Sequence, residues 1–341
     1  MLNTVYRLVA PRRFEVGYQN VELGGEDIIV RPTHLSICNA DQRYYQGLRD
    51  EEVLHEKLPM ALIHEAIGDV IWDSSGVYKP GECVVMIPNT PCEEDDFVAE
   101  NYLRSSRFRA SGYDGFMQEL IYTTADRVLP LPEELTDEVA SFTELVSVGL
   151  HAMKRLLMFS HNRKERIGIW GDGNLGYITA LLLKKMLPDS KVTVCGVNAE
   201  KLSNFTFVDE TMLTSEVSEN FSVDHAVECV GGIGSESAIG QIVDRIQPEG
   251  TIALLGVSEL PPKIPTRMVL EKGLRIFGSS RSGRQDFEEL LKLYNQQDDI
   301  TEYLTSLVNE VVKVRGLYDI PKAFEKDAVK QMGKIVIEWD G

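Results

Sequence analysis

Residues 166–176 read Arg-Ile-Gly-Ile-Trp-Gly-Asp-Gly-Asn-Leu-Gly, and this stretch decides the fold. The apolar residues before the glycines predict a buried strand, and those of 175–187 recur at helical spacing. Gly171, Gly173 and Gly176 form the pattern G-x-G-x-x-G between that strand and that helix. There the first glycine permits a tight turn, the second lets the backbone approach a pyrophosphate, and the third lets helix pack on strand.

The glycine loop therefore predicts a dinucleotide site. A helix that begins directly after it offers unpaired N–H groups and the positive end of its dipole to an anion. We expect the cofactor to lie against Gly171, Gly173, Asn174, Leu175 and Gly176. A glycine-rich turn without a ligand is the weaker alternative, because strand and helix flank the pattern as a nucleotide site requires.

The end of the next predicted strand bears on the choice of cofactor. NAD-specific sites place an Asp or Glu there, about 20 residues beyond the glycines, to bond the ribose hydroxyls. Here the strand ends at 195–198, Cys-Gly-Val-Asn, without a carboxylate. A 2′-phosphate is then not repelled, and Asn198 and Lys201 could approach it. The sequence favours NADPH, while Glu200 keeps NADH open as an alternative.

Beyond this stretch, the pattern of predicted strands and helices changes near residue 147. Residues 1–146 consist of short extended runs bounded by Gly, Pro, Asn or Asp, which predict a β-rich, antiparallel, barrel-like domain. Residues 147–283 alternate apolar strands with helices, which predicts an α/β domain with a doubly wound parallel sheet. Residues 284–341 are first amphipathic helix and then a strand, and we expect them to complete the first domain.

Composition narrows the function classes. The 341 residues include 35 Lys and Arg against 53 Asp and Glu, a net charge of −18 at pH 7. Such a surface argues against nucleic-acid and membrane partners, because both are anionic. The five cysteines are scattered and include no C-x-x-C pair, so a disulfide framework is not expected. Charge interrupts the first 16 residues before a signal peptide could form, and we expect a cytoplasmic protein.

Metal-ligating residue types recur in the first domain. Cys38 follows an apolar run, His64 and Glu65 are adjacent, and Glu144 stands near a predicted helix start. Thiolate, imidazole and carboxylate are the ligands of a tetrahedral catalytic zinc that keeps one position open. Each residue also has an ordinary explanation, as a small buried Cys or a solvated acid, so their spacing alone leaves both interpretations standing.

In this order, these motifs resemble those of the zinc-dependent medium-chain dehydrogenases/reductases over essentially the whole chain. That resemblance implies a GroES-like catalytic domain, completed by the C-terminus, and a Rossmann domain. It also implies one catalytic zinc with Cys38, His64, Glu65 and Glu144 as its ligands, where Glu144 stands at a position that carries glutamate in polyol-type members. Asp41 is the candidate partner for the imidazole of His64, although a turn aspartate is as plausible on sequence alone.

Within that family the chain looks most like the bacterial ribulose-5-phosphate reductases of teichoic acid and capsule assembly. The similar segments include 38–45, 87–91 and 278–283. This resemblance implies reduction of D-ribulose 5-phosphate to D-ribitol 5-phosphate with NADPH, and a cytidylyltransferase partner that consumes the product. Arg43, Tyr44 and Arg281 are candidates for binding the substrate phosphate, and a homo-oligomer is expected.

Two departures from the family pattern stand out. Residues 89–114 carry only Cys92 where many relatives have four cysteines, so no structural zinc is expected. Ala40 replaces the Ser or Thr that relays a proton in alcohol dehydrogenases, so the proton needs another route. Two other functions stay open: a zinc polyol or alcohol dehydrogenase acting on an unphosphorylated substrate, and a nucleotide-binding partner subunit without turnover.

Overall fold

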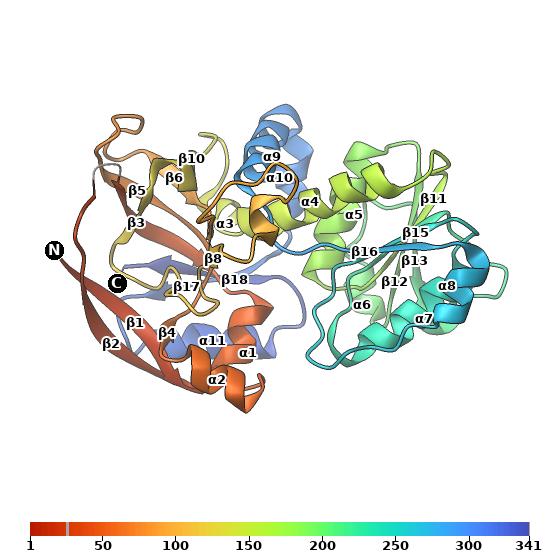
Figure 1. Ribbon diagram of the computed structural model, residues 1–341, viewed down its shortest axis with the longest axis horizontal. Helices are drawn as coiled ribbons and strands as arrows, with labels where there is room; N and C mark the ends of the chain where they lie inside the picture. Colours follow the sequence, from red (N-terminus) through yellow and green to blue (C-terminus); the bar gives the residue numbers. More distant parts are fainter. Residues whose placement is uncertain (25–26, 341) are drawn as a thin grey trace. The chain divides into compact units, whose positions relative to one another are not determined.

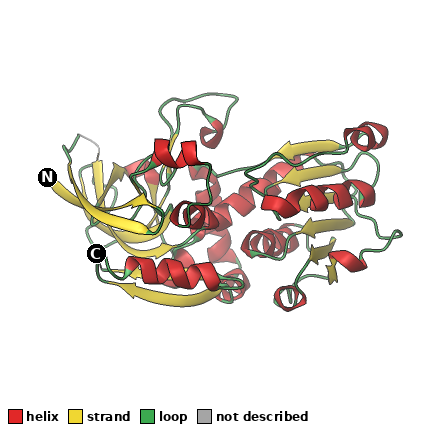
Figure 2. Ribbon diagram, turned by 90° about the horizontal axis from the view of Figure 1, so that it is seen from below, coloured by secondary structure: helices red, strands yellow, loops and turns green. Residues whose placement is uncertain are grey.

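The computed structural model describes residues 1–24 and 27–340, and the chain divides into two compact units. Unit 1 comprises Met1–Ser147 and Ser282–Gly341, and unit 2 comprises Val148–Arg281. The chain therefore passes from unit 1 to unit 2 after Ser147 and returns at Ser282. Figure 1 labels the elements, and Figure 2 contrasts the long strands of unit 1 with the alternating short strands and helices of unit 2.

Unit 2 is a six-stranded parallel sheet in the order β13-β12-β11-β14-β15-β16. Its strands are β11 (Arg166–Trp170), β12 (Lys191–Gly196), β13 (Glu210–Leu213), β14 (His225–Glu228), β15 (Thr251–Leu254) and β16 (Arg275–Gly278). Counted from β11, this is the order 3-2-1-4-5-6 of a doubly wound dinucleotide fold, which confirms the predicted fold class. Ile167 and Ile169 are buried, as expected for strands covered on both faces.

The helices of unit 2 lie on both sides of this sheet. They are α5 (Asn174–Met186), α6 (Ala199–Leu202), α7 (Ser235–Arg245) and α8 (Thr266–Lys272), and α4 (Thr143–Phe159) enters from unit 1. Figure 1 shows α5 on one side of the sheet and α7 and α8 on the other. The strand order reverses between β11 and β14, so the carboxyl ends of these two strands flank the switch point where such sheets bind nucleotides.

Unit 1 is built from strands that pair mostly antiparallel. Its main sheet runs β10-β6-β5-β3-β18-β17, with β9 also paired to β3, and a smaller sheet runs β2-β1-β4. The main strands are β3 (Asp27–Ser36), β5 (Glu65–Asp73), β6 (Cys83–Met86), β9 (Ile121–Thr124), β10 (Val128–Pro130), β17 (Val308–Val314) and β18 (Lys334–Trp339). The smaller strands are β1 (Leu2–Ala10), β2 (Arg13–Asn20), β4 (Met60–Ala61), and the pair β7 (Asn89–Thr90) and β8 (Arg107–Phe108).

Short helices complete unit 1 and present the residues of interest. They are α1 (Asn39–Tyr45), α2 (Glu51–Lys57), α3 (Asp137–Ala140), α9 (Arg284–Gln296), α10 (Asp298–Thr305) and α11 (Ile320–Val329). Within the described residues no helix combines the length and apolar character needed to cross a bilayer.

The C-terminal strand β18 is central to unit 1. It pairs antiparallel with β3 and parallel with β17, and α11 provides the crossover that two parallel neighbours require. Ile335, Val336 and Ile337 are almost fully buried, and the rings of Tyr6 and Trp339 pack edge-to-face with their centroids 5.2 Å apart. The last residues of the chain therefore fill the core of the unit that contains its first residues.

This arrangement predicts a strong dependence on β18. Because Ile337 is 0% exposed, Ile337→Ala removes buried methyl groups and leaves a cavity, so we expect a loss of about 3 kcal/mol in the free energy of unfolding. Urea denaturation measures it. The control is Glu338→Gln, whose exposed pair with Lys313 contributes less than about 0.5 kcal/mol. A loss below about 1 kcal/mol for Ile337→Ala would contradict the assignment of β18 to the core.

Candidate active site

Cys38, His64 and Glu65 converge in unit 1, where one donor atom from each lies within 4.8 Å of the other two. Among the residues that the structure describes, this is the one group of at least three such side chains close enough to share an ion. Cys38 precedes α1, and Glu65 is the first residue of β5, so two separate segments deliver the donors. Ile63 adopts a left-handed backbone, with φ of 69°, which turns the chain sharply just before His64.

Asp41 binds the two donor segments together. Its Oδ2 accepts from the backbone N–H of Cys38 at 3.1 Å, and its Oδ1 accepts from that of Ile63 at 2.9 Å. The same Oδ1 lies 3.8 Å from Nδ1 of His64. Burial raises the pKa of Asp41, since its side chain is fully enclosed. Asp41 is thus placed to orient the imidazole of His64.

The imidazole of His64 has the surroundings of a ligand. Burial alone lowers its pKa, but the charges of Asp41 and Cys38 outweigh burial and hold the pKa well above its usual value. Nδ1 is enclosed and has no hydrogen-bond partner within the described part of the chain. A thiol, an imidazole and a carboxylate that converge in this way fit the donor set of a catalytic zinc.

Lys334 is a component of this site that the sequence reasoning missed. Its ammonium group lies 2.8 Å from Oε2 and 2.9 Å from Oε1 of Glu65, and both side chains are buried. Burial disfavours the charged lysine, but Glu65 and Cys38 raise its pKa, so it remains a cation. A signal was present, because a lysine inside the apolar strand 334–339 must be paired if it is buried.

Glu144 lies in the first turn of α4 and is 4% exposed. Burial raises the pKa of its carboxyl group to about 7, and the charge of Glu65 adds to that effect while His64 opposes it. Its carboxylate does not belong to the group of three donor atoms within 4.8 Å of one another. Glu144 is therefore a buried carboxyl group that interacts with the cluster and can hold a proton near neutral pH.

The three phosphate candidates occupy different surroundings. Arg43 lies in the last turn of α1 and is partly buried. Tyr44 belongs to the core of unit 1, and the guanidinium of Arg49 stands 4.8 Å above its ring. Arg281 is the last residue of unit 2 and has a left-handed backbone, with φ of 60°. As binding residues for a phosphate they remain predictions.

The glycine loop has the predicted form. Gly171 has φ of 133°, and Gly173 caps the N-terminus of α5. A Cβ built on Gly176 would stand 2.0 Å from the carbonyl oxygen of Gly171, whereas one built on Gly173 would meet nothing within 4 Å. Gly176 is thus required for helix-to-strand packing, and Gly173 leaves open space at the end of the helix where an anion can approach.

The tip of β12 differs from the sequence-based expectation in one respect. Asn198 and Lys201 do lie there, but the Oδ1 atom of Asn198 accepts from the backbone N–H of Lys201 and caps α6. The carboxylate of Asp172, from the glycine loop, accepts from the N–H groups of Val197 and Asn198 at 2.7 and 2.8 Å. A carboxylate therefore reaches this tip from the neighbouring loop, with its charge satisfied by backbone donors.

A second carboxylate organises the switch-point edge of the sheet and was not singled out from the sequence. Glu228, at the end of β14, is buried. It accepts from the N–H groups of Val230 at 2.9 Å, Gly231 at 2.8 Å and Gly256 at 3.0 Å. These bonds fix the two loops that follow β14 and β15, at the edge where a nucleotide binds.

Comparison with known proteins agrees with both halves of this architecture. Residues 24–133 match the alcohol dehydrogenase GroES-like domain, and residues 183–296 match the zinc-binding dehydrogenase family. The chain belongs to the zinc-binding dehydrogenases. The resemblance stated from the motifs is thereby confirmed, and so is the combination of a GroES-like domain with a Rossmann domain.

Individual members of this dehydrogenase family match the chain over its full length. The chain is 53% identical to ribulose-5-phosphate reductase 1 of Staphylococcus aureus over 339 residues, which is 99% of each chain. It is 52% identical to the ribulose-5-phosphate reductase of Bacillus spizizenii over 340 residues, which is 100% of each chain. The crystal structure of S. aureus TarJ in complex with NADPH superimposes with a TM-score of 0.89, at 49% identity over 99% of each chain.

The glycine loop yields a prediction with a matched control. Gly173→Ala should fold normally but weaken NADPH binding by roughly ten-fold or more, because the added methyl group occupies the space at the helix N-terminus. Gly176→Ala should instead lower the unfolding temperature, because its methyl group collides with a backbone carbonyl. Calorimetric titration with NADPH and thermal melts measure the two effects. Equal NADPH binding by wild type and Gly173→Ala would contradict this placement of the pyrophosphate.

Glu144 yields a prediction for the metal-free protein. Its pKa rises from 4.5 to about 7 on folding, so between these values the folded state binds more protons and stability falls as pH rises. The expected loss is on the order of 2 kcal/mol, measured by urea denaturation of chelator-treated protein across that range. Glu144→Gln should remove most of the slope, and the exposed control Glu134→Gln should leave it unchanged. An unaltered slope in Glu144→Gln would refute this.

Proposed function

We propose that this protein is an oxidoreductase that reduces D-ribulose 5-phosphate to D-ribitol 5-phosphate, with NADPH as the reductant and zinc as its metal. The observation that carries the proposal is the full-length identity of 52–53% with ribulose-5-phosphate reductases, in a chain whose donor side chains converge. NADPH is assigned because TarJ, the structure with 49% identity, was solved with it.

The residues of unit 1 have different roles at the metal. Cys38, His64 and Glu65 would hold the zinc, which when bound supplies a Lewis acid for the ketose carbonyl while NADPH supplies the hydride. Asp41, whose Oδ1 lies 3.8 Å from Nδ1 of His64, would orient the imidazole toward the metal. Lys334 balances the charge of Glu65, so that a buried carboxylate can stand beside a thiolate.

Glu144 is the candidate for the proton transfer that Ala40, which has no hydroxyl group, cannot perform. A reduced carbonyl oxygen must receive a proton, and this chain lacks the hydroxyl that relays it in alcohol dehydrogenases. With its pKa raised to about 7, the carboxyl group of Glu144 can hold a proton and release it near neutral pH. Glu144 is therefore assigned as the proton donor, while Glu65 is paired with Lys334.

In unit 2, the first turn of α5 and the glycine loop would bind the pyrophosphate of NADPH. Asn198 and Lys201 are assigned to the 2′-phosphate side, with the Nδ2 group of Asn198 as the available donor, because its Oδ1 caps α6. Arg43, Tyr44 and Arg281 remain the residues assigned to the substrate phosphate. Arginine is suited to this task because its planar guanidinium binds phosphate through two hydrogen bonds.

The same proposal places the protein in the cytoplasm as a homo-oligomer. Its product would pass to a partner cytidylyltransferase, in a route to CDP-ribitol and the ribitol phosphate of teichoic acid or capsule. A pull-down with a purified cytidylyltransferase that consumes D-ribitol 5-phosphate, followed by light scattering of each protein alone and of the mixture, tests both associations.

One assay separates the remaining functions. NADPH oxidation is followed with ribulose 5-phosphate and with ribulose, with NADH in place of NADPH, and before and after chelation. We expect turnover only with the phosphorylated ketose, a strong preference for NADPH, and loss of activity on chelation that zinc restores. Faster turnover of ribulose would favour an unphosphorylated substrate, and NADPH binding without turnover of any ketose would favour a partner subunit.

The metal assignment makes a separate prediction. Cys38→Ala removes the thiolate of the donor group, so we expect loss of bound zinc and a fall in kcat of roughly 100-fold or more. Elemental analysis and NADPH oxidation measure the two effects. Cys92→Ala is the matched control, because Cys92 is exposed and outside the donor group, and it should keep its zinc. Full zinc content in Cys38→Ala would refute the assignment.

A further inference from the structure

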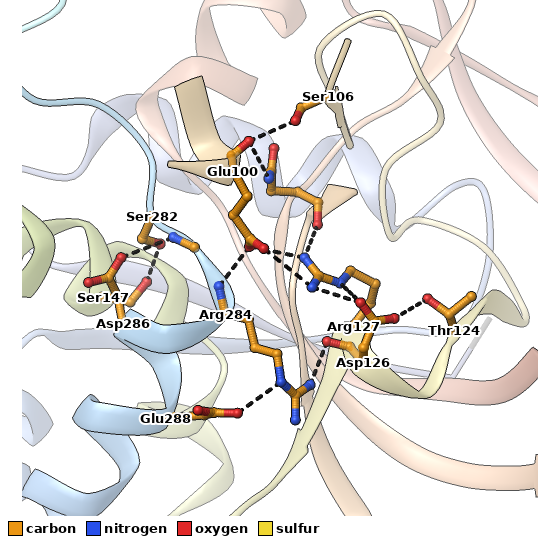
Figure 3. Close-up of polar contacts among 12 residues, drawn as sticks. Glu100, Ser106, Thr124, Asp126, Arg127, Ser147, Ser282, Arg284, Asp286 and Glu288 are labelled. Atoms are coloured by element: carbon orange, nitrogen blue, oxygen red, sulfur yellow. Dashed lines mark hydrogen bonds and ion pairs between the residues drawn. The ribbon is translucent and has the colours of Figure 1, made fainter. Parts of the chain in front are cut away.

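Glu100 is the centre of a polar network that the proposed reaction does not use. It lies in a single 3-10 turn, Glu100–Tyr102, within the segment 89–114. Its Oε1 accepts from the backbone N–H of Arg284 at 2.7 Å and from Nη1 of Arg127 at 3.0 Å, and its Oε2 faces Nη2 of Arg127 at 3.4 Å. One carboxylate thus joins segments that lie far apart in the sequence, as Figure 3 shows.

Arg127 makes this carboxylate hard to replace. The arginine side chain is 4% exposed, and besides Glu100 it contacts the exposed Asp126 and the backbone carbonyl of Asn89, at 3.0 Å. The carbonyl oxygen of Glu100 itself accepts from Asn89 at 3.2 Å and from Ser106 at 2.7 Å. The buried guanidinium would lose its more enclosed anionic partner if Glu100 became neutral.

The other side of Glu100 holds the beginning of α9. Arg284 is the first residue of this helix, and its N–H is one of the donors that a helix leaves unpaired at its N-terminus. Gly283 precedes it, and a Cβ built there would stand 2.9 Å from Cγ of Glu100. The carboxylate therefore lies directly against the backbone at 283–284 and leaves no room for a side chain.

From Gly283 the network continues into α4. Ser282 and Ser147 are both buried, and their Oγ atoms are 2.6 Å apart. Ser147 donates its one hydroxyl proton to the carbonyl oxygen of Glu144 at 2.7 Å, so Ser282 must be the donor between the two serines. Ser147 is the residue at which the chain leaves unit 1 and Ser282 is the residue at which it returns. The hydrogen bond between the two serines thus joins the two segments where the chain leaves and re-enters unit 1, and it links both to the first turn of α4.

The residue just before this bond has a strained backbone. Arg281 has φ of 60°, a left-handed conformation that side chains other than glycine rarely adopt and that persists only where neighbouring contacts impose it. The contacts on its C-terminal side are those of Ser282, Gly283 and Arg284 with Ser147, Asp286 and Glu100. Figure 3 shows these contacts in two groups, which the backbone of residues 282–284 joins.

We propose that Glu100 is a positioning residue for the active site: by fixing residues 282–284 it holds Ser282 on Ser147, and through Ser147 it holds the turn of α4 that carries Glu144. The proposal rests on the proposed function for the role of Glu144. The carboxylate of Glu100 contacts Arg127 and the backbone N–H of Arg284, and it acts by the five bonds that lead from Arg127 to the carbonyl of Glu144.

The test uses the full-length, zinc-loaded enzyme and three variants. Glu100→Gln removes the charge, Ser282→Ala removes the link to Ser147, and the double variant combines both changes. Glu288→Gln is the matched control, since Glu288 contacts the side chain of Arg284 at 2.9 Å but not this route. For each we measure kcat and KM for ribulose 5-phosphate, the Kd for NADPH, and the visible spectrum after cobalt replaces zinc.

We expect Glu100→Gln and Ser282→Ala each to lower kcat by roughly ten-fold, to change KM and the NADPH Kd by less than about two-fold, and to shift the cobalt spectrum. The double variant should be no slower than about twice the worse single variant, because both changes break the same route. Glu288→Gln should match wild type in every measurement.

Several results would overturn the proposal. Wild-type kcat in Ser282→Ala, multiplicative losses in the double variant, or an unchanged cobalt spectrum would each show that Glu100 only anchors the segment 89–114. If Glu100→Gln does not fold, Ser282→Ala decides alone by the same criteria. If the wild type reduces no ribulose 5-phosphate, the proposed function fails, and the cobalt spectra still decide whether Glu100 acts on the metal site.

Discussion

A lysine side chain that is 2% exposed requires an anion within reach, and in this chain the anion is Glu65, which stands beside the thiol of Cys38 and the imidazole of His64. Burial of such a pair costs desolvation free energy, and removal of one partner lowers the free energy of unfolding by roughly 3–5 kcal/mol. The donor group and the C-terminal strand are therefore stabilised by the same contact.

The two units place their chemistry at the ends of strands, but by different means. In unit 2 the glycine loop uses backbone geometry, and the carboxylates of Asp172 and Glu228 fix the neighbouring loops through backbone N–H groups. In unit 1 side chains carry the function, and Asp41 performs the corresponding task for Cys38 and Ile63. Carboxylates that accept several backbone donors thus fix loops in both units of this fold.

The sequence predicted the features whose causes are local. The glycine pattern, its flanking strand and helix, and the alternation that produces a parallel sheet all depend on residues a few positions apart, and each is present as expected. The residue types of Cys38, His64 and Glu65 indicated a metal site, but their convergence depends on how β3 and β5 pair, which no short pattern encodes.

The functional residues that the sequence did not indicate have partners far away in the sequence. Lys334 meets a glutamate 269 positions earlier, and Glu100 meets the backbone of a residue 184 positions later. Asp172 was read only as a variable position of the glycine motif, yet it reaches the tip of β12, 25 residues away. Such pairs become visible only when the topology brings the strands and loops together.

The central place of β18 also determines when the enzyme can be completed during its synthesis. Unit 2 is encoded by one continuous stretch, 148–281, whereas unit 1 begins with the first residues and is finished by the last. While the ribosome is still adding residues 334–339, the sheet of unit 1 lacks a strand between β3 and β17, and Glu65 lacks its counter-ion. The nucleotide-binding half can fold before residues 334–339 have been made, whereas the metal-binding half can be completed only after they have left the ribosome.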